Sequence, residues 1–174
     1  MIVFVDETGF SFQTRVARTW APRGCPPVLR RKSQRRQLST IVALTLSGRI
    51  YKLHSRVALR GPAVVKLLRH LRACLKRPLI VIWDRASTHC SRVVKEYLSS
   101  HKEIVVEWLP PYAPELNPEE YCHGNVKEQL RNATPATVEE MRQQVDRGFN
   151  RLRKRPDLLL SFFRHAGLRV KHLS

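Results

Sequence analysis

Three short apolar runs along the chain, the last of them interrupted only by Glu107, predict buried strands. They cover residues 2–5, 79–83 and 104–109 and are too short for helices. Between the first two runs, residues 38–46 and 49–55 predict two further strands joined by a turn at Ser47-Gly48. We also expect a short strand near residues 18–21.

Apolar residues at helical spacing predict a helix that begins at Gly61-Pro62 and ends before Pro78. Further helices are expected over residues 91–100, from Asn117-Pro118 to about 131, from Thr134-Pro135 to about 153, and over 157–165. Apolar strands that alternate with helices are typical of an α/β fold, a mixed sheet covered on both faces. No flexible linker divides the 174 residues, so we expect a single domain spanning residues 1–174.

The charge of the chain is its most unusual property. Lys and Arg number 32 against 14 Asp and Glu, which gives a net charge of +18. So large an excess in a folded domain indicates a polyanionic partner, most often nucleic acid. No apolar run approaches the roughly 20 residues that cross a bilayer, and the four scattered cysteines lack a C-x-x-C pair. These features predict a cytoplasmic protein without a membrane partner, a zinc site or a disulfide framework.

The few acidic residues are placed where the predicted strands end. Asp6 and Asp84 each follow an apolar run, and Glu119 and Glu120 open a helix shortly after the third run. Functional groups gather at the carboxyl ends of strands in open α/β sheets. Carboxylates that converge there repel one another unless a cation such as Mg²⁺ or Mn²⁺ lies between them. Two such ions can hold the attacking and the leaving oxygen while a phosphodiester bond is broken by in-line displacement. The alternative is that these residues only cap turns or helices.

Four segments carry a resemblance to a known family. They are Val-Asp-Glu-Thr at 5–8, Arg-Thr-Trp-Ala-Pro-Arg-Gly at 18–24, Trp-Asp-Arg-Ala-Ser-Thr-His at 83–89 and Leu-Pro-Pro-Tyr-Ala-Pro-Glu-Leu-Asn-Pro-Glu-Glu at 109–120. They resemble the DDE transposases of the mariner superfamily, and more narrowly its bacterial insertion-sequence branch. The resemblance extends from residue 2 to about residue 165.

This resemblance implies a ribonuclease H-like fold, two Mg²⁺ (or Mn²⁺) ions, and DNA strand cleavage and transfer. Carried over by motif, Asp6, Asp84 and Glu120 are the catalytic, metal-binding carboxylates. The chain departs from relatives at Arg85, where Asn is common, and at His123, where Trp is common.

The resemblance also bears on partners. Relatives carry helix-turn-helix modules before the first catalytic strand, and Met1 leaves no room for one here. We therefore expect the catalytic part of a split or truncated bacterial transposase, associated with the nucleoid. Its expected partners are double-stranded DNA at transposon ends and target sites, a second copy of the chain as a homodimer, and a helix-turn-helix protein from an upstream reading frame.

The choice between Glu119 and Glu120 stays open at this stage. Motif position favours Glu120, whereas the usual spacing from Asp84 would select Glu119 as runner-up. Glu120 is also placed to form a capping box with the backbone N–H of Asn117. Glu119 shares a helical face with the apolar stripe Cys122, Val126 and Leu130.

Several basic residues are candidate DNA contacts, against the alternative of solvated loops. They are Arg30, Arg31, Lys32, Arg35 and Arg36 in a cluster, Arg85 and His89 near Asp84, and Arg151 and Lys154 near a helix end.

Three functions remain under consideration. A transposase catalytic domain is the leading hypothesis. A ribonuclease H-fold nuclease or resolvase that only cuts is the second, and a non-catalytic, basic DNA-binding transposase remnant is the third. Retention of all three acids favours an enzyme.

Overall fold

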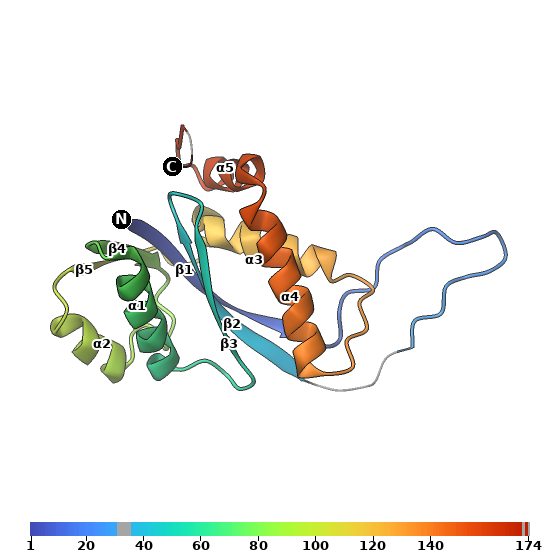
Figure 1. The fold of residues 1–174 in the computed structure, drawn as a ribbon, viewed down its shortest axis with the longest axis horizontal. Helices are drawn as coiled ribbons and strands as arrows, with labels where there is room; N and C mark the ends of the chain where they lie inside the picture. Colours follow the sequence, from blue (N-terminus) through green and yellow to red (C-terminus); the bar gives the residue numbers. More distant parts are fainter. Residues whose placement is uncertain (31–35, 172, 174) are drawn as a thin grey trace.

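The fold is built on a mixed sheet of five strands in the part of the chain that the computed structural model describes, residues 1–30, 36–171 and 173 (Figure 1). The strands are β1 (Ile2–Ser11), β2 (Gln37–Thr45), β3 (Ile50–Ser55), β4 (Leu79–Trp83) and β5 (Ile104–Trp108). Their order is β3-β2-β1-β4-β5. The first three pair antiparallel, and β4 and β5 run parallel to β1.

Helices cover both faces of this sheet. The helices α1 (Gly61–Leu75) and α2 (Arg92–Ser99) pack on one face, and α3 (Pro118–Gln129), α4 (Val138–Arg153) and α5 (Pro156–His165) pack on the other (Figure 1). The alternation of side chains along β1 sends Val3 and Val5 into the first layer and Phe4 into the second. The predicted α/β architecture is confirmed. None of the described helices has the length and apolar character needed to cross a membrane.

The strand β1 is longer than the sequence predicts, and Asp6 lies within it rather than at its end. The strand pairs with β4 only as far as Phe4, opposite Ile82, but continues beside β2 as far as Ser11. Polar residues interrupt the apolar run after Val5, yet backbone pairing with β2 keeps the chain extended. Asp6 therefore lies beyond the last β1–β4 pair, level with the end of β4.

Two other predicted elements differ from the structure. Residues 18–21 form no strand, and the segment from about residue 12 to 30 is largely exposed and extends away from the body of the molecule (Figure 1). Trp20 in this segment is fully exposed. The helix expected from Thr134-Pro135 begins only at Val138. Thr137 caps it, because its Oγ1 accepts a hydrogen bond from the Glu140 N–H at 3.1 Å.

A glycine sets the spacing of α3 and α4. A Cβ added to the buried Gly148 would lie 2.9 Å from Cγ1 of Val126, which is itself fully buried. Gly124 in α3 is exposed, and an added Cβ there meets nothing within 4 Å. The two positions form a matched pair, since each is a glycine inside a helix.

We expect Gly124→Ala to raise the free energy of unfolding by roughly 0.5–1 kcal/mol, because alanine is the better helix former. The same change at Gly148 should lower stability, since overpacking typically costs about 1–3 kcal/mol. Denaturant unfolding of both variants measures the difference. Equal stabilisation would mean that α3 and α4 can move apart without cost.

Candidate active site

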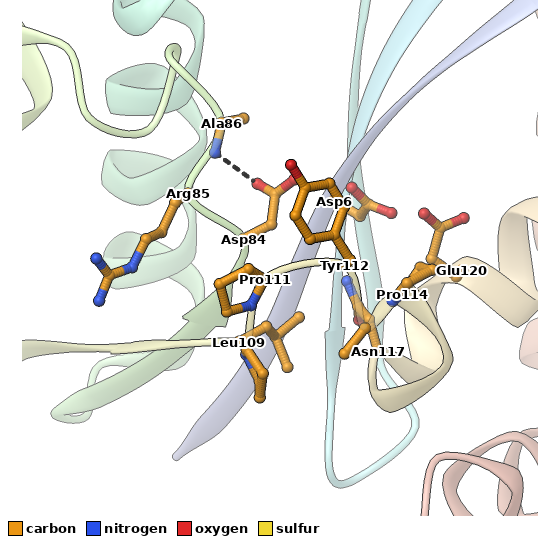
Figure 2. Close-up of a pocket in the computed structure, with 12 residues that line it drawn as sticks. Asp6, Asp84, Arg85, Ala86, Leu109, Pro111, Tyr112, Pro114, Asn117 and Glu120 are labelled. Carbon is orange, nitrogen blue, oxygen red and sulfur yellow. Dashed lines mark hydrogen bonds between the residues drawn. The ribbon is translucent and has the colours of Figure 1, made fainter.

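A pocket of about 500 Å³ opens where β4 ends beside the middle of β1 (Figure 2). Three carboxylates that the sequence singles out, those of Asp6, Asp84 and Glu120, line it together. They come from β1, the end of β4 and the first turn of α3. The other lining residues are Arg85, Ala86, Leu109, Pro110, Pro111, Tyr112, Ala113, Pro114 and Asn117.

Asp6 is the most buried of the three acids. Its Oδ1 accepts a hydrogen bond from the Glu7 N–H at 2.8 Å, whereas its Oδ2 is buried without a hydrogen-bond partner. Burial raises the pKa of Asp6, but His123, together with Glu120 and the Glu7 N–H, outweighs this effect and holds the pKa below its usual value. Asp6 is therefore an ionised carboxylate with one unused oxygen.

Asp84 is held at the end of β4 by its neighbours in sequence. Its Oδ1 accepts a hydrogen bond from the Ala86 N–H at 3.1 Å (Figure 2) and lies 2.9 Å from Nδ1 of His89. The His89 ring stacks on Trp83, with the ring centres 4.4 Å apart, and its Nε2 lies 3.5 Å from Oε1 of Glu7. These contacts fix the direction in which Asp84 points.

His89 does not have the exposure that a DNA contact requires. Only 2% of it is accessible, because it is enclosed by Trp83, Asp84 and Glu7. Burial would lower the pKa of His89, but the carboxylates of Glu7 and Asp84 raise it above its usual value. The expected phosphate contact is corrected to a buried contact with Asp84.

The Asn-Pro motif joins α3 to β1. The side chain of Asn117 is buried; its Oδ1 accepts from the Glu119 N–H at 3.1 Å, and its Nδ2 donates to the Val5 carbonyl at 3.4 Å. Pro118 occupies the first helical position, where its missing N–H costs nothing. One side chain thus caps the helix and attaches it beside Asp6.

Glu119 and Glu120 point to different environments. Glu120 is exposed at the pocket, where desolvation together with the nearby Asp6 raises its pKa to about 7. Glu119 is fully buried, with Oε2 2.6 Å from Nε2 of His123. As expected from its helical face, Glu119 lies inward with Cys122 and Val126.

The capping box considered for Glu120 is wrong. The backbone N–H of Asn117 donates to the carbonyl of Pro114 at 2.9 Å, because residues 114–116 form a turn of 3₁₀ helix just before α3. The Glu120 carboxyl group is therefore not used for that cap and faces the pocket.

His123 lies between Glu119 of α3 and Asp6 of β1. Its Nδ1 lies 3.6 Å from Oδ2 of Asp6, and the ring is 1% exposed. Burial would lower the pKa of His123, but Glu119 and Asp6 raise it to about 9. Ligand atoms of Asp6, Glu120 and His123 all lie within 4.8 Å of one another. The sequence had flagged His123 only as a departure; its position four residues after Glu119 on a helix was the signal for the contact.

The basic candidates have different surroundings. Arg85 borders the pocket with its guanidinium 5.7 Å from the centre of the Trp108 ring, and it points away from Asp6 and Glu120 (Figure 2). Arg30, Arg36, Arg151 and Lys154 are exposed, and Arg151 also donates to Asn125 at 3.1 Å. Arg31, Lys32 and Arg35 lie outside the described residues.

Tyr112 forms one rim of the pocket. It is fully exposed and has a φ of 59°, a left-handed conformation that is uncommon for a bulky residue. It lines the same pocket as Asp84 and Asp6, and its ring is drawn between them in Figure 2. Such backbone outliers cluster at ligand-binding sites.

Comparison with known structures gives matches over nearly the whole chain. The Mos1 transposase in a paired-end complex with the left transposon end matches with a TM-score of 0.66 and 19% identity, over 99% of this chain and 56% of that one. The separate catalytic domain of Mos1 mariner transposase matches with a TM-score of 0.59 and 19% identity, over 96% and 82%. A simian T-cell lymphotropic virus intasome matches with a TM-score of 0.58 and 17% identity, over 89% and 47%.

These matches confirm the predicted ribonuclease H-like fold, and the chain spans a little over half the length of the full Mos1 chain. No curated protein matches the sequence. The family model described as DDE superfamily endonuclease matches residues 1–142, which include Asp6, Asp84 and Glu120. By this match the chain belongs to the DDE superfamily of endonucleases.

Proposed function

We propose that the protein is the catalytic domain of a transposase that cleaves DNA strands and transfers them with the help of divalent cations. The convergence of Asp6, Asp84 and Glu120 on one pocket, in a chain of net charge +18, carries this proposal. The likeness in fold to Mos1 transposase supports it.

The residues of the pocket fit a divalent cation. Asp6 Oδ2 is buried without a hydrogen-bond partner, and burial together with the nearby Asp6 raises the pKa of Glu120. Hard oxygen donors that repel one another suit Mg²⁺ or Mn²⁺. Asp6, Asp84 and Glu120 would hold these ions, two in our proposal. When bound, the ions would supply activation of the attacking oxygen and neutralisation of charge on the leaving oxygen.

The chain's own groups orient the reaction. The Glu7 and Ala86 N–H groups direct the carboxylates of Asp6 and Asp84. Arg85 borders the pocket and would contact a DNA phosphate on the side away from Asp6 and Glu120, and the exposed ring of Tyr112 would offer a face on which a base can stack. The more distant cations Arg30, Arg36, Arg151 and Lys154 would follow the DNA backbone, together with Arg31, Lys32 and Arg35.

The proposed partners follow from the same function. They are double-stranded DNA at transposon ends and target sites, a second copy of the chain to pair two ends, and a helix-turn-helix protein from an upstream frame. The proposed setting is the bacterial nucleoid. A nuclease that cuts without strand transfer is the second candidate, because the same pocket serves both reactions.

We expect Asp6→Asn, Asp84→Asn and Glu120→Gln to reduce Mn²⁺-dependent cleavage of transposon-end DNA to background, since each removes a charged oxygen ligand. Glu119→Gln should retain activity at saturating Mn²⁺, because its carboxyl group lies in the protein interior and not in the pocket. Cleavage and strand joining are followed on labelled end-sequence DNA.

Circular dichroism of each variant is the control for folding. If Glu119→Gln loses activity and Glu120→Gln keeps it, then Glu119 is the metal ligand and Glu120 is not. Intact DNA binding with no cleavage by the unaltered chain in any metal would support the non-catalytic remnant. Cleavage without joining would support the nuclease.

Removal of metal should make Glu120 destabilising near neutral pH. Its pKa is raised in the folded protein, from 4.5 to about 7, so its charged form costs stability as pH rises from about 4.5 and the cost is complete above about 7. In EDTA, Glu120→Gln should therefore be more stable than the unaltered protein at pH 8. The gain, on the order of 1 kcal/mol after solvent screening of this partly exposed group, should vanish near pH 4. Thermal unfolding at several pH values measures it, and a pH-independent difference would contradict the electrostatic cause.

Binding to duplex DNA should weaken steeply with salt and show little sequence preference. Replacing Arg30, Arg31, Arg35 and Arg36 together with Ala should flatten the plot of log K against log salt, by up to about 0.9 for each phosphate that the variant no longer neutralises. A matched control replaces four exposed cations on the α1–α2 side of the sheet, Lys66, Arg77, Lys95 and Lys102. Equal slopes for the two variants would mean that the arginine cluster does not contact DNA more than other exposed cations do.

A further inference from the structure

His123 is a buried imidazole at the edge of the proposed metal site. Its ring is 1% exposed and lies on α3, three residues after Glu120 and four after Glu119. Its Nδ1 makes no hydrogen bond, and the same is true of the atom that it faces, Oδ2 of Asp6. The two atoms form an ion pair but no hydrogen bond, so each keeps a buried lone pair or N–H that a third group can use.

The separation of these atoms suits two ligands of one cation. Nδ1 of His123 and Oδ2 of Asp6 are 3.6 Å apart, beyond a normal hydrogen bond. Ligand atoms about 2.1 Å from a common ion lie roughly 3–4 Å from each other, depending on the angle between them. An oxygen of Glu120 falls within the same 4.8 Å group.

The opposite side of the ring faces a carboxylate. Nε2 of His123 forms an ion pair with Oε2 of the fully buried Glu119 at 2.6 Å, although the angles are not those of a hydrogen bond. A histidine that binds a metal through one ring nitrogen usually presents the other to a carboxylate, which fixes the ring and makes the ligand more basic. Glu119 supplies such a carboxylate, and this gives a use to a buried acid that the proposed reaction does not otherwise need.

We propose that Nδ1 of His123 is a nitrogen ligand of the ion held by Asp6 and Glu120, and that the site therefore prefers a first-row transition ion such as Mn²⁺ over Mg²⁺. The inference rests on the proposed function, because it concerns the same metal site. Imidazole nitrogen binds transition ions well, whereas Mg²⁺ favours oxygen ligands and retains its water. Binding displaces the proton on Nδ1 to solvent.

Mn²⁺ bound to the full chain provides a direct test, because electron spin-echo envelope modulation detects a directly coordinated nitrogen. We expect nitrogen coupling in the unaltered protein that changes when its histidines are labelled with ¹⁵N. The coupling should disappear in His123→Gln, which keeps a partner for Glu119 but has no atom in place of Nδ1. It should persist in His89→Gln, the matched change at the other buried histidine that contacts a catalytic aspartate.

Calorimetric titration with Mn²⁺ and with Mg²⁺ gives a second readout. His123→Gln should weaken Mn²⁺ binding about tenfold or more and Mg²⁺ binding much less, so that the preference between the ions falls. Mn²⁺ binding that requires Asp6 but shows no nitrogen coupling would overturn the inference and leave the proposed function intact. In that case His123 would only form an ion pair with Asp6 and Glu119.

Two other outcomes would also overturn it. Nitrogen coupling that disappears in His89→Gln but persists in His123→Gln would make His89 the ligand. No Mn²⁺ binding to the unaltered chain would overturn the inference and the proposed function together. Because the spin-echo measurement on the unaltered protein needs no substitution, a variant that fails to fold does not remove the test.

Discussion

The site depends on one constraint, which is that β1 stops pairing with β4 after Phe4. Up to that residue β1 is paired on both sides, and beyond it only β2 holds the strand. The gap leaves Asp6 beside the end of β4, where Asp84 follows, and leaves the Val5 carbonyl free to accept from Asn117. Because α3 is attached at this point, Glu120 reaches the same pocket. A β4 longer by two residues would occupy this space.

The two aspartates share a second arrangement. Each contacts a buried histidine, and each of those histidines faces a glutamate that is adjacent in sequence to a carboxylate of the pocket. Asp84 contacts His89, which faces Glu7, and Asp6 contacts His123, which faces Glu119. The pairs differ in geometry, since His89 lies 2.9 Å from its aspartate and His123 lies 3.6 Å away. The closer pair orients the Asp84 carboxylate, and the wider pair has the separation on which the proposed ion site rests.

Charge is distributed so that a small acidic pocket lies within a strongly basic protein. The segment before β2 and the carboxyl-terminal end of α4 both carry exposed basic side chains, among them Arg30, Arg36, Arg151 and Lys154. A polyanion drawn by the net charge of +18 would meet repulsion at the pocket itself. Under the proposed function, cations between the carboxylates would remove that repulsion, so that DNA binding and metal binding would each favour the other.

The sequence determined the elements that are governed by local rules. Apolar runs predicted the strands, and proline at the first position of α3 and α5 and at the second position of α1 marked where those helices start, because short-range pattern and backbone geometry decide these features. The burial expected of residues 104–109 is wrong, because β5 is an edge strand in which only Ile104 is buried. Family motifs brought Asp6, Asp84 and Glu120 forward as candidates. The extension of β1 past Asp6 was missed because its cause is pairing with β2, and α4 began later than Thr134-Pro135 because the Thr137 cap decided its start.

Tertiary structure decided which titratable side chains are buried and which of them meet across the sheet. Sequence spacing left Glu119 and Glu120 as alternatives, and the packing of α3 against β1 turned one into the interior and the other to the pocket. The sequence suggested His89 as a DNA contact and marked His123 only as a difference from the family pattern. In the structure, both are buried beside an aspartate. The contacts of His89 with Asp84 and of His123 with Glu119 are local. The physical reason is that burial, and the distances of these rings from Glu7 and Asp6, arise from segments more than 70 residues apart, which no local pattern of residues encodes.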